Sequence, residues 1–185
     1  MKLVTLDRDG VINKDSADFI KTPEEWVPIK NSLQAIARLS QAGYDVVVVT
    51  NQSGIGRGYF TATTLSRIHA HMISQVEQHG GRIDSVLFCP HHPDEGCACR
   101  KPAIGLYQEL ASRLNVSFNG VYSVGDSVRD LLAAQAAGAT PVLVQTGNGK
   151  KSIKEIAANS DLKLSDTRVF KNLSGFVDAL LQKEI

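Results

Sequence analysis

The sequence predicts an α/β fold of three layers, in which helices cover both faces of a parallel β-sheet. Short apolar, β-branched runs recur along the chain, and each is nearly continuous rather than alternating with polar residues. Strands of that kind are buried on both faces. Stretches with helical periodicity separate the runs, and strict alternation of strand and helix implies right-handed crossovers within one parallel sheet.

The expected strands lie at residues 2–6 (KLVTL), 44–50 (YDVVVVT), 83–89 (IDSVLFC), 120–125 (GVYSVG) and 140–146 (TPVLVQT). The helix that follows the first strand, residues 31–43, has a possible cap at Asn31 or Ser32 and ends at Gly43. The next helix, residues 61–81, also ends in glycine. Further helices are expected at residues 104–116, 127–139 and 173–183.

Composition limits the class of protein. A chain of 185 residues can form one well-buried core, so a single domain spanning residues 1–185 is expected. Hydrophobic residues make up 43% and charged residues 21%, and the formal net charge is +1, so no global field favours nucleic acid or anionic lipid. No apolar stretch approaches the roughly 20 residues that span a bilayer. The sequence predicts a cytoplasmic monomer with a small-molecule partner and neither nucleic-acid nor membrane binding.

Polar residues follow four of the expected strands. The first strand leads into DRDG (residues 7–10), the second into TNQSG (50–54), the third into a cysteine-rich loop and the fourth into GDSVRD (125–130). In such a sheet, ligands bind beyond the carboxyl ends of the strands, where the strand order reverses. A lone aspartate at such an end often only caps the next helix. The coincidence of several acids, a hydroxyl, an amide and a lysine at one rim indicates an active site.

The acids favour phosphoryl chemistry. Asp7 and Asp9 point the same way in an extended segment and, with Asp126, can supply carboxylates to Mg²⁺. Mg²⁺ normally engages few protein carboxylates together with substrate phosphate. A carboxylate beside the ion can attack phosphorus to form an aspartyl phosphate, while a second acid protonates the leaving alkoxide and later deprotonates water. The developing charge would be stabilised by Thr50, Asn51 and Lys101.

All three cysteines lie in CPHHPDEGCACRKP, residues 89–102. Cytosolic thiols stay reduced, so a metal site is favoured over disulfides. A closed set of four ligands, typical of structural zinc, is formed by Cys89, His91, Cys97 and Cys99 in the pattern C-x-H-x5-C-x-C. His92 can exchange with His91 as the imidazole ligand. The ion would pin the loop and so hold Arg100 and Lys101 at fixed positions facing the phosphate site.

The motifs LDRDG, VVTNQSG, CRKP and VGDSVRD, in that order, resemble the four motifs of the haloacid dehalogenase (HAD) superfamily of phosphatases. The resemblance covers about the first 150 residues and implies the Rossmann-like HAD fold. It implies that Asp7 is the nucleophile and Asp9 the acid/base. The phosphoryl stabilisers implied are Thr50 and Lys101, and the implied Mg²⁺ ligands are Asp7, the backbone carbonyl of Asp9, and Asp126.

Within that superfamily, the zinc loop and the near absence of a cap insertion are similar to the phosphatases of heptose 1,7-bisphosphate. This implies removal of the 7-phosphate on the way to nucleotide-activated heptose for lipopolysaccharide. Histidinol phosphate, the substrate of close kin, is the alternative. Ser127 follows Asp126, where the heptose enzymes often carry a lysine. The implied substrate contacts are Asp7, Arg8, Asp9, Asp15, Ser16, Ala17, Asp18, Thr50, Asn51, Gln52, Ser53, Arg100 and Lys101.

Other motifs carry less weight. GIGRG (54–58) lacks the spacing of a dinucleotide fingerprint, and TGNGKKS (146–152) lacks that of a P-loop and is predicted to be a solvated turn. His69 and His71 face different sides of one helix, so no metal site is expected there. Asp130 is either an acid that supports the metal site or part of a helix N-terminal turn.

Two other classes of protein share some of these features. A receiver-like phospho-accepting switch protein also clusters acids and a lysine at strand ends, but it needs neither Asp9 nor a zinc loop. A zinc-ribbon nucleic-acid module would explain the cysteines, yet the chain lacks a basic stripe and interleaved aromatic residues. The sequence therefore favours an enzyme, a Mg²⁺-dependent phosphoric monoester hydrolase with structural Zn²⁺.

Overall fold

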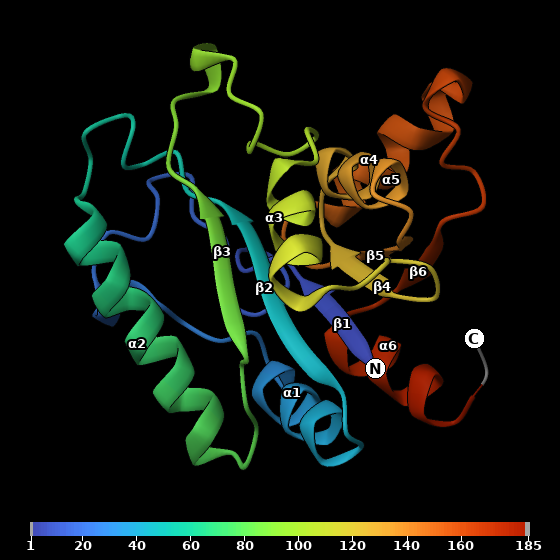
Figure 1. Ribbon diagram of the computed structural model, residues 1–185, viewed down its shortest axis with the longest axis horizontal. Helices are drawn as coiled ribbons and strands as arrows, with labels where there is room; N and C mark the ends of the chain where they lie inside the picture. Colours follow the sequence, from blue (N-terminus) through green and yellow to red (C-terminus); the bar gives the residue numbers. More distant parts are fainter. Residues whose placement is uncertain (1, 184–185) are drawn as a thin grey trace.

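A computed structural model describes residues 2–183. Six parallel strands form one sheet in the order β3-β2-β1-β4-β5-β6, as seen from the edge strand β3 across to β6 (Figure 1). The strands are β1 (Leu3–Leu6), β2 (Asp45–Asn51), β3 (Ser85–Cys89), β4 (Tyr122–Gly125), β5 (Thr140–Val144) and β6 (Arg168–Phe170). The predicted α/β fold class is confirmed.

Helices cover both faces of this sheet. One layer consists of α1 (Ser32–Gln41), α2 (Ala62–Gln78) and α6 (Leu173–Leu181). The other consists of α3 (Gly105–Leu114), α4 (Val128–Ala136) and α5 (Gly149–Ala158). Single-turn 3-10 helices lie at Pro23–Glu25, Pro93–Glu95 and Ser160–Leu162. Within residues 2–183, none of the helices combines the length and the apolar character needed to cross a membrane.

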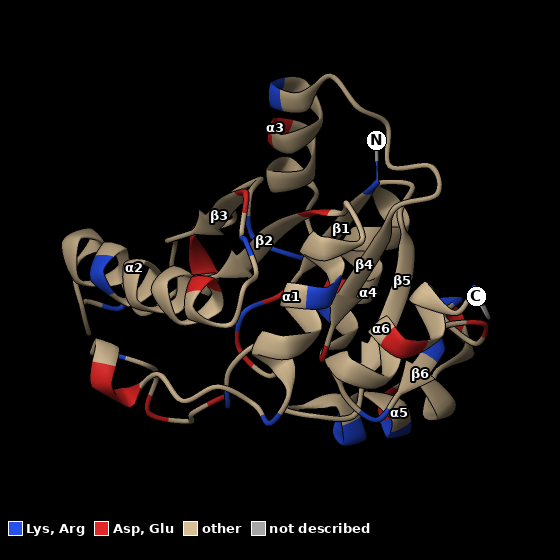
Figure 2. Ribbon diagram, turned by 90° about the horizontal axis from the view of Figure 1, so that it is seen from below, with Lys and Arg blue, Asp and Glu red and all other residues tan. Residues whose placement is uncertain are grey.

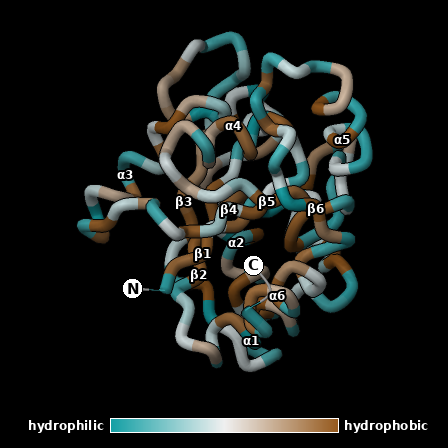
Figure 3. Tube along the Cα trace, turned by 90° about the vertical axis from the view of Figure 1, so that its right-hand side faces the viewer, coloured by the Kyte–Doolittle hydropathy of each residue, from teal (hydrophilic) through white to brown (hydrophobic). Residues whose placement is uncertain are grey.

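The core lies on both sides of the sheet because neighbouring residues in a strand point to opposite faces. Val4 and Leu6 of β1 pack with α1, α2 and α6, whereas Leu3 packs with α3 and α4. Figure 3 shows the strands and the inner sides of the helices as the most hydrophobic parts of the chain. Charged residues lie mostly outside the strands, and Asp45 and Arg168 are the charged residues within them (Figure 2).

Local signals explain where several helices begin and end. Thr61 caps α2 by accepting a hydrogen bond from Thr64 N, and Asn172 caps α6 in the same way from Gly175 N. Gly43 follows α1 in the left-handed conformation, with φ of +79°, which glycine adopts without strain. Asn31 occupies the cap position of α1, but its side chain makes no capping hydrogen bond within the described residues.

Each predicted strand and helix is present, but helix α5 and strand β6 were not predicted. The stretch 146–152 was predicted as a solvated turn, and this was wrong for its second half, because α5 begins at Gly149. Ile153 and Ile156 of this helix pack with Leu131 and Leu143. The edge strand β6 was also missed, since it has only three residues and two of them are exposed.

The strand order places two of the predicted site loops next to each other. β1 pairs with β2 on one side and with β4 on the other, so the order reverses at β1. A crevice opens at such a point beyond the carboxyl ends of the strands. Asp7 directly follows β1 and donates its N–H to Val124 O of β4 at 2.8 Å. The loops that carry Asp7 and Asp126 therefore leave neighbouring strands at the same edge.

Candidate active site

Three buried carboxylates meet at this edge. Asp7, Asp126 and Asp130 each offer an oxygen within 4.8 Å of the others. Burial raises the pKa of Asp7 to about 6. Burial, reinforced by the negative charges of Asp130 and Asp7, raises the pKa of Asp126 to about 8. Negative charge is therefore in excess here, and the hard oxygen donors suit a cation such as Mg²⁺.

The backbone closes tightly around Asp126. A Cβ atom added at Gly10, where φ is +80°, would lie 2.0 Å from Asp126 Oδ2, and one at Gly147 would lie 2.1 Å from it. Asn148 N also donates to Asp126 Oδ2, at 2.7 Å. Only glycine permits such close approach. The contribution of residues 146–148 was not predicted from the sequence, although their position after the end of β5 could have indicated it.

Lys101 bridges two of the three acids. Its Nζ lies 3.2 Å from Asp7 Oδ1 and 2.6 Å from Asp130 Oδ1, and it donates to Val49 O at 2.7 Å. The side chain is only 2% exposed. Burial acts against the charge, but Asp130 and Asp7 raise the pKa of Lys101, so it remains an ammonium ion. The site thus holds a fixed positive charge beside Asp7.

Of the two roles that the sequence left open for Asp130, the structure shows the one in the helix N-terminal turn, and it adds a pairing with Lys101. Asp130 Oδ2 accepts a hydrogen bond from the N–H of Ser127, the N-cap residue of α4, at 3.0 Å. Asp130 Oδ1 pairs with Lys101. Burial opposes ionisation, yet Lys101 and then Arg129 hold the pKa of Asp130 below its usual range. Asp130 therefore both caps a helix and anchors the lysine.

Hydrogen bonds from three side chains hold the carboxylate of Asp9. Arg8 donates from Nε to Oδ1 at 3.1 Å and from Nη2 to both oxygens at 2.9 Å. Asn13 Nδ2 donates to Oδ1 at 2.8 Å and Gln52 Nε2 to Oδ2 at 2.9 Å. Burial opposes the charge, but Arg8, Asn13 and Gln52 together lower the pKa of Asp9. Asp9 is therefore an oriented carboxylate.

The second strand contributes residues that support this arrangement. Thr50 is buried and accepts from Gln52 Nε2 at 3.1 Å. Asn51 bonds the backbone of Lys101 in both directions, accepting from its N–H at 3.0 Å and donating to its carbonyl at 3.1 Å. The loop that carries Lys101 is thereby fastened to the end of β2.

A cavity of about 240 Å³ lies above the acids. Many of the predicted substrate residues line it: Asp7, Arg8, Asp9, Asp15, Ser16, Asn51, Gln52, Ser53 and Arg100, together with Asp126. Four predicted residues are not part of its lining: Ala17, Asp18, Thr50 and Lys101. Five that were not predicted line it too: Phe19, Ile20, Arg57, Arg129 and Asn148. Arg57 lies in GIGRG and Arg129 in GDSVRD, so the motifs contained them without marking their role.

Four arginines line the cavity: Arg8 is paired with Asp9, whereas Arg57, Arg100 and Arg129 bring further positive charge. Burial, then the nearby charge of Arg129, lowers the pKa of Arg100. Arg100 Nη1 is buried and makes no hydrogen bond within residues 2–183. Mutually repelling guanidinium groups with an unpaired donor indicate that the cavity receives an anion.

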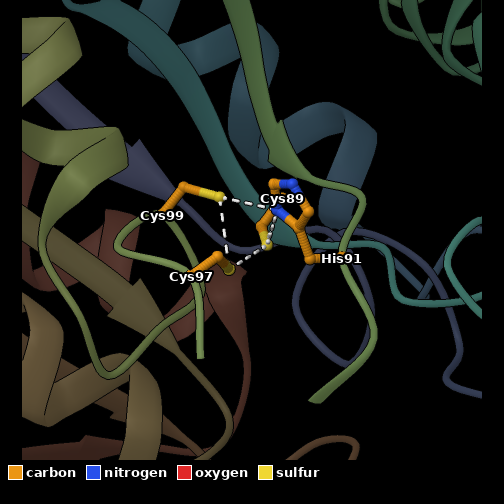
Figure 4. Close-up of side chains that lie close together, drawn as sticks. All are labelled: Cys89, His91, Cys97 and Cys99. Atoms are coloured by element: carbon orange, nitrogen blue, oxygen red, sulfur yellow. Dashed lines mark hydrogen bonds between the residues drawn. The ribbon is translucent and has the colours of Figure 1, made fainter. Parts of the chain in front are cut away.

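The predicted zinc ligands lie together (Figure 4), and Arg100, which directly follows Cys99, lines the cavity. Cys89 Sγ lies 3.5 Å from both His91 Nδ1 and Cys97 Sγ, and Cys99 Sγ lies 3.2 Å from His91 Nδ1 and 3.6 Å from Cys97 Sγ. Ligand atoms about 2.0–2.3 Å from one tetrahedral zinc ion are separated by similar distances. His92 is turned elsewhere, since its Nδ1 accepts from Asp94 N at 3.3 Å. The residues present fit a closed four-ligand site.

Comparisons with known proteins agree with this geometry. A family model described as HAD-hydrolase-like matches residues 98–174. The chain is 51% identical over 183 residues to the D-glycero-beta-D-manno-heptose-1,7-bisphosphate 7-phosphatase of Bordetella bronchiseptica, covering 99% of each chain. It is 51% identical over 166 residues to the phosphatase of the same name from Pseudomonas putida, covering 90% of this chain and 95% of the relative.

Solved structures give the same result. The crystal structure of D,D-heptose 1,7-bisphosphate phosphatase from B. bronchiseptica, complexed with magnesium and phosphate, superimposes with a TM-score of 0.93, at 50% identity and 99% coverage of each chain. The phosphatase of the same name from Burkholderia thailandensis gives a TM-score of 0.74, at 43% identity, covering 98% of this chain and 99% of that one.

Proposed function

Since the chain belongs to the D-glycero-beta-D-manno-heptose-1,7-bisphosphate 7-phosphatase family of HAD-like hydrolases, we propose that it removes the 7-phosphate of this sugar bisphosphate through an aspartyl-phosphate intermediate. One observation carries the proposal: a buried Asp7 paired with Lys101 lies at the base of a cavity that four arginines line, one of them bonded to Asp9. The reaction would serve the formation of nucleotide-activated heptose.

The carboxylates supply both covalent and proton-transfer chemistry. Asp9 is ionised in the free site, so it first takes up a proton. Asp7 then attacks phosphorus, and the bond from phosphorus to the sugar oxygen breaks while Asp9 gives that oxygen this proton. Asp9 then takes a proton from water, which attacks the phosphoryl group and releases phosphate from Asp7. Lys101, with Thr50, stabilises the negative charge that develops on the phosphoryl oxygens.

Magnesium fits the acidic centre. The relative from B. bronchiseptica binds magnesium and phosphate, and in this chain Asp7, Asp126 and the backbone carbonyl of Asp9 would hold the ion. When bound, Mg²⁺ neutralises phosphoryl oxygens and orients the group that is transferred. The close packing of Gly10 and Gly147 against Asp126 supports the assignment, because it holds this ligand in one orientation.

We assign structural zinc to Cys89, His91, Cys97 and Cys99. Four protein ligands leave no coordination position for water or phosphate, so the ion would act only by holding the loop. Arg100 and Lys101 directly follow Cys99, and their charges would then need no reorganisation during the reaction. We place the protein in the cytosol, where such thiols remain reduced. The proposed residues all lie in or beyond the strands of one sheet, so we propose a single domain that acts as a monomer.

The cavity favours a bisphosphate over the alternative substrate. With one phosphate on Asp7, the second phosphate of the sugar can pair with Arg100, whose Nη1 has no partner. Asp15 and Ser16 line the cavity as well and would meet sugar hydroxyls. Histidinol phosphate carries an amine in place of the second phosphate, and three guanidinium groups repel a cation. A receiver-like switch protein would leave the oriented Asp9 without a role.

Hydrolysis rates over a panel of phosphate esters test this function. Wild type with Mg²⁺ should show its highest kcat/KM on the heptose bisphosphate, and Arg100→Ala should lose about tenfold or more on it, because charge-assisted hydrogen bonds to phosphate are lost. For a small monophosphate ester, the kcat/KM of Arg100→Ala should fall by less than about threefold. Arg113→Ala, an exposed arginine on α3, is the matched control and should leave all rates unchanged. Equal losses on both substrates would place Arg100 on the reacting phosphoryl group instead.

A further inference from the structure

A buried arginine connects Asp9 to helix α2. Arg8 is among the largest fully buried side chains and is only 1% exposed. Nε and Nη2 of its guanidinium face Asp9, and Nη1 lies 3.3 Å from Nε2 of His69. His69 belongs to α2, which carries none of the catalytic motifs, and it was considered in the sequence only as an improbable metal ligand.

The buried guanidinium depends on its partners. Removing a charge from water is costly unless each donor finds an acceptor. Asp9 accepts from one edge of the group, and Nη1 forms its hydrogen bond with His69. The Nε2 atom can accept only if the ring is neutral with its proton on Nδ1. Burial and the adjacent Arg8 lower the pKa of His69 to about 3, which is consistent with a neutral ring at pH 7.

The ring of His69 is itself held in place. It is 7% exposed and packs edge-on against Phe88 of β3, with the ring centroids 5.8 Å apart. The guanidinium of Arg8 is therefore hydrogen-bonded at two edges, to the carboxylate of Asp9 and to the fixed imidazole of His69. A planar group bonded at two edges has little freedom to rotate.

We propose that His69 is a positioning residue for the reaction: by accepting a hydrogen bond from Arg8 it fixes the guanidinium, which in turn holds the Asp9 carboxylate where it transfers protons. The inference rests on the proposed acid/base role of Asp9. Without an acceptor at position 69, Nη1 must turn toward another one. This displaces the hydrogen bonds from Nε and Nη2 to Asp9 and leaves its carboxylate oriented by Asn13 and Gln52 alone. A displacement of about 1 Å in a catalytic group can cost about a hundredfold in rate.

The proposal differs from a simple packing role because it predicts dependence on the leaving group. A sugar alkoxide needs a proton as it departs, whereas p-nitrophenolate is stable as an anion and needs none. A misoriented Asp9 therefore slows phosphoryl transfer from the sugar to Asp7, whereas phosphoryl transfer from the nitrophenyl ester keeps its rate. General loss of structure, or of metal, would slow both substrates equally.

Single-turnover kinetics with enzyme in excess separate these outcomes. His69→Phe should slow consumption of the heptose bisphosphate by about tenfold or more and change release of p-nitrophenolate from p-nitrophenyl phosphate by less than about twofold. His69→Gln keeps an acceptor and should restore most of the lost rate. His79→Phe, at the exposed end of the same helix, should leave both rates unchanged. Equal slowing of both substrates by His69→Phe, or no slowing of either, would overturn the proposal.

Two further measurements keep the inference distinct from the proposed function and from misfolding. Asp9→Asn should show the same leaving-group dependence. If Asp9→Asn slows both substrates equally, the proposed acid/base role of Asp9 is wrong. If Asp9→Asn shows the leaving-group dependence and His69→Phe does not, only the positioning role of His69 is wrong. Nitrogen NMR of the wild-type ring at pH 7 needs no variant. The neutral form protonated on Nδ1 is expected, and a proton on Nε2 would overturn the proposal.

Discussion

Asp7→Asn should abolish turnover of the heptose bisphosphate. An amide is a poor nucleophile toward phosphorus, and it is also a weaker ligand for magnesium than a carboxylate. The change removes as well the charge that pairs with Lys101, at 3.2 Å from Asp7 Oδ1. Steady-state phosphate release measures the effect, with circular dichroism to show that the variant is folded.

A control variant with the same substitution at an exposed site shows whether the loss of one aspartate charge alone lowers the rate. Asp161→Asn makes the same substitution at an exposed position in the 3-10 helix Ser160–Leu162, and it should leave the rate unchanged. The covalent mechanism is refuted if Asp7→Asn keeps a rate within about tenfold of wild type, which corresponds to roughly 1.4 kcal/mol in the barrier.

Removal of the zinc site should have the next largest effect. Cys97→Ala combined with Cys99→Ala removes two ligands, so the ion should be lost and the loop after β3 should become mobile. The sheet has its own cores on both faces, so the fold should survive, unlike that of a small zinc finger. We expect a rate loss of about a hundredfold because Lys101 shifts relative to the phosphoryl oxygens.

Three measurements on the double variant check these expectations: metal analysis for zinc loss, circular dichroism for the fold and kinetics for the rate. Asp94→Ala changes an exposed residue of the same loop outside the four ligands and should retain zinc and activity. Zinc-loaded wild type should still require added Mg²⁺, because a closed site cannot bind phosphate or activate water. A zinc-free variant that is folded and fully active would contradict a role for the ion in catalysis.

The sequence predicted the fold well because the signals were strong and local. β2, with the run VVVV, and α2, which ends before glycine, came within a few residues of their observed bounds. β6 and α5 escaped because their signals are weak: β6 has three residues at a sheet edge, and α5 follows a glycine-rich turn with two lysines in its first turn.

The candidate site divides in the same way. Asp7, Asp126 and Lys101 could be predicted because each follows a strand or lies in a recognisable motif. Arg57 and Arg129 could not be predicted, since they reach the cavity only because the loop after β2 and the first turn of α4 converge there. The contact of His69 with Arg8 spans 61 residues of sequence, and no local pattern announces such a pairing.

The regiochemistry of hydrolysis distinguishes a 7-phosphatase from an enzyme that removes the 1-phosphate. Phosphorus NMR of D-glycero-beta-D-manno-heptose 1,7-bisphosphate, incubated with the wild-type protein and Mg²⁺, distinguishes the two phosphate esters and free phosphate in one spectrum. We predict that the 7-phosphate signal disappears as inorganic phosphate grows, while the 1-phosphate signal remains. Loss of the 1-phosphate first, or an unchanged spectrum with folded, metal-loaded protein, would contradict the proposed function.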